Sequence, residues 1–200
     1  RAMKFAAGYQ LRDEDEEPFT QIVAEFQDQI EEVYFPWPGL PSGRSPLGGV
    51  SGAVDWEAQR RLESDLAFFK SRGVKLNLLL NASCYGGYGN SRYLVNLVRS
   101  IVAHLCATVG LDSVTTMSPL IAGAVIERRT GIAWEEAIAA RVFRPLGMAS
   151  AGYGGVGTPG RVDQPWPHPK SGAPAASNGP SVDNPPVLGP AGRVHCSMED

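Results

Sequence analysis

The feature that most constrains the fold is an alternation of strand-like and helix-like segments over the first 120 residues. Residues 74–80 (VKLNLLL) give the clearest strand, because they are continuously apolar from Leu78, as a parallel strand buried on both faces requires. Lys75 and Asn77 interrupt the first half of this segment, so one face is expected to be polar there. The strand predicted to be the most buried contains Leu76, Leu78, Leu79 and Leu80.

Three further segments are predicted to be strands, namely residues 4–10, 32–35 and 113–117. Amphipathic helices are predicted between the strands, since apolar residues recur there at helical spacing. The first helix is expected to begin at Pro18, and its apolar positions are Phe19, Ile22, Val23, Phe26 and Ile30.

The other two helices of this region carry recognisable start and stop signals. Asp55 is a suitable N-cap for the second helix, and Gly73 is a suitable stop. Asn90 or Ser91 is expected to open the third helix, and Gly110 to close it. The inward-facing residues of the second helix are predicted to be Leu62, Leu66 and Phe69. The apolar residues that indicate the third helix are Leu94, Leu97, Val98, Ile101 and Leu105.

Strands and helices that alternate at this spacing predict an α/β fold built from parallel βα units with right-handed crossovers. Four strands would make half of an eight-stranded barrel, and a doubly wound sheet is the alternative. No glycine fingerprint follows residues 4–10, so no dinucleotide is expected, and no other cofactor is predicted.

Residues 121–148 are expected to form two helices. Ala122, Val125 and Ile126 place apolar groups on one side of the first, which is expected to stop at Thr130-Gly131. Trp134, Ile138 and Val142 form an apolar stripe on the second, which is expected to end before Pro145.

The remainder of the chain is rich in Gly and Pro. Residues 149–200 hold nine of the sixteen prolines and nine of the twenty-three glycines. Since Pro removes hydrogen-bond donors and Gly adds chain entropy, we predict that Gly152 to Gly192 is mostly irregular.

The formal net charge of −3 gives no electrostatic reason to expect a nucleic-acid partner. No apolar run reaches the roughly 20 residues that span a bilayer, so no membrane span is expected. The chain begins at Arg1 without a signal-peptide pattern, so we expect a fragment. Three widely spaced cysteines favour a reducing, cytoplasmic compartment over a disulfide framework.

In parallel βα proteins, ligands bind at the carboxyl ends of the strands. Arg44 follows the second predicted strand, and its guanidinium could hold a carboxylate or phosphate, although an arginine that braces the loop is an equal alternative. Asn81, Ser83 and Cys84 follow the best strand. These four residues are the candidate binding residues, for a small-molecule or peptide ligand.

Catalytic and metal-binding patterns are weak. Cys84 would be a nucleophile only with a neighbouring base, and His104, the nearest histidine in sequence, is expected to face packing or solvent. His168, His195 and Cys196 do not have the paired spacing of a structural zinc site, so no metal is predicted.

The segment from about Lys4 to Ile121 resembles the collagenase-like family of barrel peptidases. The resemblance lies in EEVYFPWPGLPSGR (residues 31–44), LNLLLNASCYG (76–86) and VTTMSPLIA (114–122). It implies that these segments belong to the second, third and fourth βα units of a barrel. The cysteine-containing signature of that family falls later in its chain and is absent here, so no catalytic residue is carried over.

The second part resembles the serine β-lactamase-like hydrolases, which include class C and penicillin-binding relatives. The matching text is IAGAVIERRTGIAWEEAIAARVFRPLGM (residues 121–148) and DNPPVLGPAGRVHCSMED (183–200). Those enzymes use a Ser-x-x-Lys nucleophile, which this sequence lacks, and a Tyr-x-Asn element. Val114 and Thr116 occupy the positions that correspond to its Tyr and Asn.

The two resemblances together predict a fusion, with a half barrel in residues 1–120 and an internal hydrolase segment in residues 121–200. Because the motifs of both families are missing, we expect no catalytic activity from the chain alone. Two alternatives remain, a non-catalytic binding module and an enzyme completed by another chain.

Overall fold

The computed structural model describes residues 3–11, 15–43, 55–156, 161, 172 and 192–200. The contacts between Cα atoms divide the chain into two compact units, residues 1–121 and 122–200. Each unit is described by itself below.

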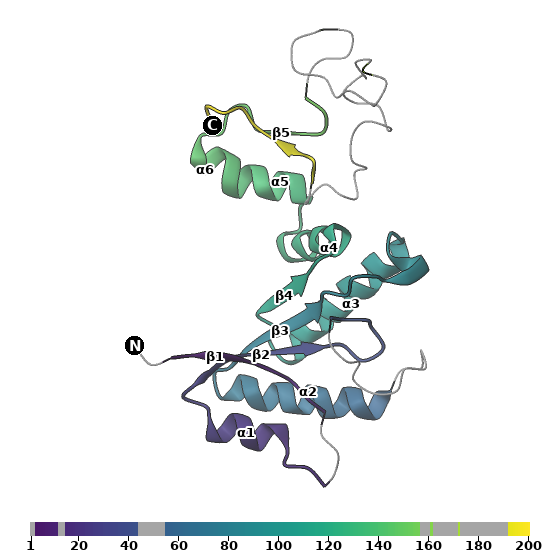
Figure 1. The fold of residues 1–200 in the computed structure, drawn as a ribbon, viewed down its shortest axis with the longest axis vertical. Helices are drawn as coiled ribbons and strands as arrows, with labels where there is room; N and C mark the ends of the chain where they lie inside the picture. Colours follow the sequence, from purple (N-terminus) through teal and green to yellow (C-terminus); the bar gives the residue numbers. More distant parts are fainter. Residues whose placement is uncertain (1–2, 12–14, 44–54, 157–160, 162–171, 173–191) are drawn as a thin grey trace. The chain divides into compact units, whose positions relative to one another are not determined.

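The first unit is a four-stranded parallel sheet with the order β1-β2-β3-β4 (Figure 1). Each strand therefore pairs with its neighbours in sequence, and the order does not reverse within the described sheet, as it does in a doubly wound fold. The α/β class is confirmed. The elements are β1 (Phe5–Gly8), α1 (Phe19–Glu25), β2 (Ile30–Pro36), α2 (Trp56–Ser71), β3 (Lys75–Leu80), a short 3₁₀ turn η1 (Gly86–Tyr88), α3 (Arg92–Thr108) and β4 (Ser113–Thr116).

One face of the sheet forms the core of this unit. Leu76, Leu78 and Leu80 of β3 are fully buried, and Val33 and Phe35 lie beside the first two in the register of β2. Leu79, on the other face, is 7% exposed, so the predicted burial of this strand is confirmed. Helix α2 packs on β3, and its inward side chains are all fully buried: Leu62, Leu66 and Phe69.

The other face of the sheet is polar at its centre, as the interrupted start of β3 predicted. The amide nitrogen of Asn77 donates to Glu32 Oε1 at 3.1 Å, and its amide oxygen accepts from Thr115 Oγ1 at 3.1 Å. These bonds join β2, β3 and β4 across the sheet. Because side chains alternate along a strand, this polar row and the leucine core belong to the same strand.

The predicted ends of α2 and α3 are confirmed. Asp55 Oδ1 accepts from the Ala58 amide at 3.0 Å, and Ser91 Oγ accepts from the Leu94 amide at 3.2 Å, so both side chains are N-caps. Beyond the helix ends, Gly73 and Gly110 have φ values of +78° and +70°. Such angles favour glycine, which has no Cβ to clash.

The first helix is shorter than predicted. It ends at Glu25, and Pro18 occupies the N-cap position instead of the first helical one. Phe26 is 44% exposed, and Ile30 begins β2 opposite Phe5 of β1. Phe26 and Ile30 continue the helical spacing of apolar residues, but the pairing of Ile30 with β1 decides the local structure in favour of a strand.

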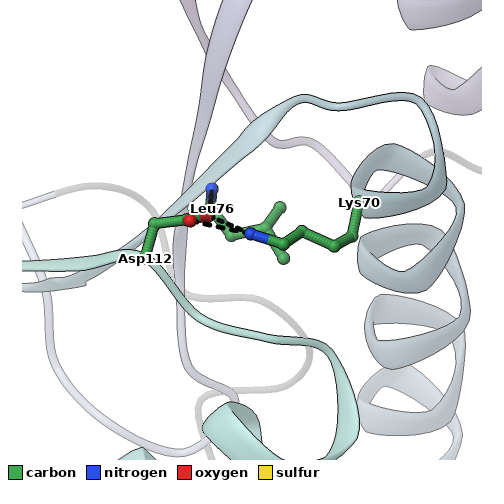
Figure 2. Close-up of polar contacts among 3 residues, drawn as sticks. All are labelled: Lys70, Leu76 and Asp112. Atoms are coloured by element: carbon green, nitrogen blue, oxygen red, sulfur yellow. Dashed lines mark hydrogen bonds and ion pairs between the residues drawn. The ribbon is translucent and has the colours of Figure 1, made fainter.

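A polar contact closes the amino-terminal edge of the sheet (Figure 2). Asp112, just before β4, accepts hydrogen bonds from Lys70 Nζ at 2.7 Å and from the Leu76 amide at 2.8 Å. The Asp112 amide in turn donates to the Leu76 carbonyl at 3.1 Å. One carboxylate therefore connects α2, β3 and the start of β4.

The second unit begins within α4 (Pro119–Thr130), which ends before Gly131 at φ +75° as predicted. It continues with α5 (Trp134–Ile138), a π-helical turn η2 (Ala139–Phe143) and α6 (Arg144–Leu146). The prediction that this helix ends before Pro145 is wrong, since it continues to Leu146. Proline cannot donate the usual bond and crowds the carbonyl four residues earlier, and the wider π turn before it accommodates both effects.

Two short strands complete the second unit, β5 (Gly152–Tyr153) and β6 (Val194–His195), which pair in antiparallel orientation. The sequence did not predict either strand. Tyr153 packs between Trp134 and Phe143, with ring centroids 5.3 and 5.7 Å away. The predicted irregular segment, Gly152 to Gly192, falls mainly outside the described residues. Of the helices in the described part, none has the length and apolarity to cross a membrane.

Candidate functional site

The carboxyl ends of the four parallel strands meet at one edge of the sheet, where ligands bind in such folds. The residues that follow the first three strands are Tyr9, Trp37 and Asn81. The side chain of Tyr9 is buried, and its hydroxyl donates to Asp65 Oδ2 at 2.8 Å. Tyr9 therefore anchors β1 to α2, which leaves Trp37 and Asn81 as the residues nearer a ligand surface.

Asn81, a predicted binding residue, has a structural partner. Its side-chain oxygen accepts a hydrogen bond from the Gly43 amide at 2.9 Å. A Cβ at Gly43 would lie 3.0 Å from Asn81 Nδ2, so the loop after β2 approaches Asn81 closely. In this structure Asn81 holds that loop against the end of β3. Arg44, the next residue of the loop, lies outside the described residues.

Ser83 and Cys84, the other two predicted binding residues, are exposed. The Cys84 sulfur accepts from the Gly86 amide at 3.2 Å, a contact within its own turn. No hydrogen bond joins Cys84 to a base among the residues that the structure describes. Cys106 and Cys196 are also free and exposed.

His104 has a specific role that the sequence analysis did not predict. Its Nε2 lies 2.9 Å from Glu63 Oε1 on α2. The same carboxylate oxygen accepts from Gln59 Nε2 at 2.8 Å, and the indole of Trp37 contacts the imidazole edge-to-face at 6.2 Å. These contacts bring the loop after β2 together with α2 and α3.

A groove of about 480 Å³ is lined by residues of α2, of α3 and of the segment that follows β2, and it includes Trp37, Gln59 and His104. We call it the aromatic groove, because Trp37, Trp56 and Tyr93 lie along it together with Leu40, Leu97 and His104. Trp56 is 66% exposed and Tyr93 is 61% exposed, which is high for such large rings. Tyr88 contacts Tyr93 at a centroid distance of 5.3 Å and extends the aromatic surface beyond the groove.

The sequence contained a signal for the α3 side of this groove. Tyr93, Leu97, Ser100 and His104 recur at spacings of four, three and four, so they share one helix face. Leu97 is also one of the apolar residues that identified the helix, and it is half-buried at the groove, whereas Leu94, Val98, Ile101 and Leu105 are buried. The contribution of Trp37 and Glu63 depends on the fold, because no local spacing relates them to α3.

Ser100, His104 and Glu63 are the residue types of a serine triad. Ser100 and His104 line the groove, and Glu63 contacts His104. A triad also needs a hydrogen bond between the nucleophile and the base. The Ser100 side chain is exposed and makes no hydrogen bond to another described residue. The contact that would activate the hydroxyl is therefore missing.

The positions that correspond to the hydrolase Tyr-x-Asn element lie in a strand. Val114 and Thr116 belong to β4, and Thr116 Oγ1 accepts from the Ser118 amide at 3.0 Å. Neither side chain can provide a phenol or an amide. Thr116 instead caps the turn that leads into α4.

The described part of the chain contains no group of three or more His, Cys, Asp and Glu side chains that could hold a metal ion. His195 Nδ1 lies 3.1 Å from the Gly154 carbonyl oxygen, within the β5–β6 pair. His168 lies outside the described residues.

Comparison with known proteins gives no further guide to function. No family model matches the chain, and neither the curated proteins nor the solved structures yield a significant match. The two resemblances therefore stay predictions from the sequence.

Proposed function

We propose that this protein is a non-catalytic binding protein built from hydrolase-like parts, and that the aromatic groove is its ligand site. The observation that carries the proposal is the exposure of Trp56 and Tyr93 at the groove. Beside them, Gln59 and His104 are both held by the Glu63 carboxylate. Large rings held in water at a groove offer apolar contact area that a ligand can bury.

The fold supports a half barrel as the scaffold of this module. Consecutive strands pair in the order β1-β2-β3-β4, which is the order in a (β/α) barrel. Right-handed connections that always advance in the same direction place successive helices on one face of a sheet. The leucines of β3 face that side, and the polar row of Asn77 faces the side that would become the barrel interior.

The environments of the two candidate nucleophiles, Cys84 and Ser100, support a non-catalytic role. The Cys84 sulfur accepts a hydrogen bond within its own turn, and no hydrogen bond joins the Ser100 hydroxyl to the His104 imidazole. Covalent catalysis needs a nucleophile in contact with its activating base. Residues 121–200 are proposed to be an internal segment of a serine hydrolase fold, and they contribute no Ser-x-x-Lys motif.

The groove is best suited to an extended, proline-containing peptide. Aromatic-lined grooves bind such peptides because the polyproline helix is already ordered and its rings pack flat on aromatic side chains. The groove also offers hydrogen-bonding groups at Gln59, Ser100 and His104, which could pair with peptide carbonyls. Among the described residues, its lining contains no lysine or arginine, so a neutral ligand fits this part of the groove better than an anionic one.

Calorimetric titration of the full chain with a proline-rich decapeptide tests the proposal. We expect Trp56→Ala to weaken binding by about tenfold or more, since buried aromatic anchors dominate such interfaces. Phe26→Ala is the matched control, because Phe26 is an exposed aromatic residue that does not line the groove. Circular dichroism should show the same fold for both variants.

Two results would contradict this function. One is the absence of measurable binding to the unmodified chain at millimolar peptide. The other is equal binding by the Trp56→Ala variant and the unmodified chain, which would place the peptide elsewhere. A decapeptide with every proline replaced by alanine should bind more weakly, since it must lose more conformational freedom on binding.

Completion by a second chain is the other candidate function, and the sheet edges favour it. Within the described sheet, β1 and β4 each have a single neighbour, so each presents an unpaired edge. Sedimentation analysis at micromolar to submillimolar concentration distinguishes the two cases. A monomer at every concentration excludes completion by a copy of this chain, and a stable dimer supports it.

A further inference from the structure

A second groove lies in the second unit, between α4 and the helical segment formed by residues 134–142. Its volume is about 440 Å³, and most of its lining is apolar. Val125 and Ile126 lie on the α4 side, and Ile138 and Val142 lie on the other side. We call it the arginine groove, for the two arginines described next.

The apolar stripe that identified this helix is only partly covered. Trp134, at the start of the stripe, is 7% exposed and packs against Tyr153. Ile138 is half-buried and Val142 is 38% exposed. Among the described residues, burial therefore decreases along the stripe, and the uncovered part is the wall of the groove.

Two cations line this apolar surface. Arg129 comes from α4 and Arg141 from the π-helical turn, and both are exposed. Neither guanidinium group makes a hydrogen bond or ion pair with another described residue. A guanidinium presents a planar set of donors that matches a carboxylate, so the pair supplies positive charge without a partner.

We propose that the arginine groove binds an amphiphilic carboxylate, with its aliphatic chain on Val125, Ile126, Ile138 and Val142 and its carboxylate at Arg129 and Arg141. The volume falls within the roughly 300–1,000 Å³ typical of small-molecule sites. Such sites combine a mostly apolar lining with a few placed polar groups, which is the composition seen here.

Isothermal titration of the full chain with decanoate, below the concentration at which it forms micelles, tests this inference. Decanoate should bind, whereas the cationic decyltrimethylammonium should bind at least about tenfold more weakly, a difference of about 1.4 kcal/mol. Acetate carries the headgroup alone and should not bind measurably. Affinity should rise from hexanoate to octanoate to decanoate, by about fourfold for each buried methylene.

Arginine variants separate a built site from general attraction to positive charge. Arg129→Gln and Arg141→Gln should each weaken decanoate binding by about tenfold, which corresponds to about 1.4 kcal/mol. Arg128→Gln is the matched control, because Arg128 is an exposed neighbour on α4 that does not line the groove. It should bind decanoate as the unmodified chain does.

The inference is wrong if decanoate does not bind. It is equally wrong if the groove binds an apolar protein segment and does not bind decanoate. It also fails if affinity is independent of chain length, or if Arg128→Gln weakens binding as much as the groove variants do. Val142→Ser gives an independent check, because Val142 is exposed enough to tolerate a hydroxyl. It should weaken decanoate more than hexanoate, and equal effects on both ligands would argue against the assigned position of the chain.

Discussion

The ammonium group of Lys70 lies 2.7 Å from both carboxylate oxygens of Asp112, a residue 42 positions further along the chain (Figure 2). The same carboxylate receives the Leu76 amide at the start of the most buried strand. This contact lies at the amino-terminal edge of the sheet, opposite the edge that carries the aromatic groove. In βα folds, contacts at the amino-terminal edge serve stability and those at the carboxyl edge serve ligands.

Asp112→Asn should make stability less dependent on acid pH. Burial by itself raises the pKa of Asp112, but hydrogen bonds from Lys70 and the Leu76 amide, together with nearby lysine charges, outweigh it and lower this pKa. A carboxylate with a lowered pKa stabilises the fold above its unfolded pKa of about 3.9, and this contribution is lost as pH falls through the folded value.

Urea unfolding at pH 7 and pH 3 measures this difference. At pH 7 the variant should be destabilised by about 1 kcal/mol, a modest value because the pair is about one-third exposed and screened by solvent. The difference between variant and unmodified chain should shrink at pH 3. Asp28→Asn is the control, as Asp28 is exposed. An undiminished difference at pH 3 would contradict the assignment.

Tyr9→Phe should destabilise the first unit by about 1–3 kcal/mol, because it removes the hydroxyl that donates to Asp65 and leaves a partly buried carboxyl without it. Burial already raises the pKa of Asp65, and the bond from Tyr9 offsets part of that shift. Thermal unfolding measures the change. Tyr88→Phe, at an exposed ring, should have almost no effect, and equal changes in both variants would count against this role.

Leu78→Ala should be among the most damaging substitutions in the chain. Leu78 is fully buried between Phe35 of β2 and Val114 of β4 in register, so truncation leaves a cavity and costs about 2–5 kcal/mol. Leu146→Ala removes the same atoms at a site that is 69% exposed. Chemical unfolding of the two variants should differ clearly, and similar stabilities would show that β3 is not central to the core.

The purified chain should not turn over a chromogenic cephalosporin above buffer, and a fluorophosphonate or a penicillin should label no serine. The reason is the missing contact between nucleophile and base at Ser100 and the absence of Ser-x-x-Lys. Losing such a unit costs on the order of 10⁶ in rate in a comparable serine enzyme. Mass spectrometry that finds stoichiometric labelling, abolished by Ser100→Ala and by His104→Gln, would establish a working triad instead.

The strands and two of the helices of the first unit could be predicted because their signals are local. The apolar run of β3, the caps Asp55 and Ser91 and the stop at Gly73 each act within a few residues. The first helix was overextended to Ile30, because its apolar spacing also suits a strand and only the pairing with β1 decides between them. The π turn before Pro145 was not predicted, because a proline was expected to end the helix. The wider turn instead allows the helix to continue past it.

The candidate site was predictable only in its general position. The rule of carboxyl ends selected the loop after β2, which contains Trp37, and the loop after β3, which contains Asn81. It did not select Trp56, Glu63 or His104, because these residues come from helices whose faces meet only after folding. Asn81 illustrates the converse, since a residue chosen as a ligand contact bonds to the backbone of Gly43.

The strand order β1-β2-β3-β4 has a consequence for biosynthesis. Each strand pairs with the one made just before it, so the sheet can grow outward at one edge in the order in which the ribosome delivers the strands. Asp112 is translated after Lys70 and Leu76. Its contacts with these two residues can therefore stabilise the preceding βα unit before the second unit is complete. Domains generally fold as units during synthesis, the amino-terminal one first. A ribosome paused once residues 1–121 have left its exit tunnel should therefore carry a nascent chain whose sheet is already resistant to protease.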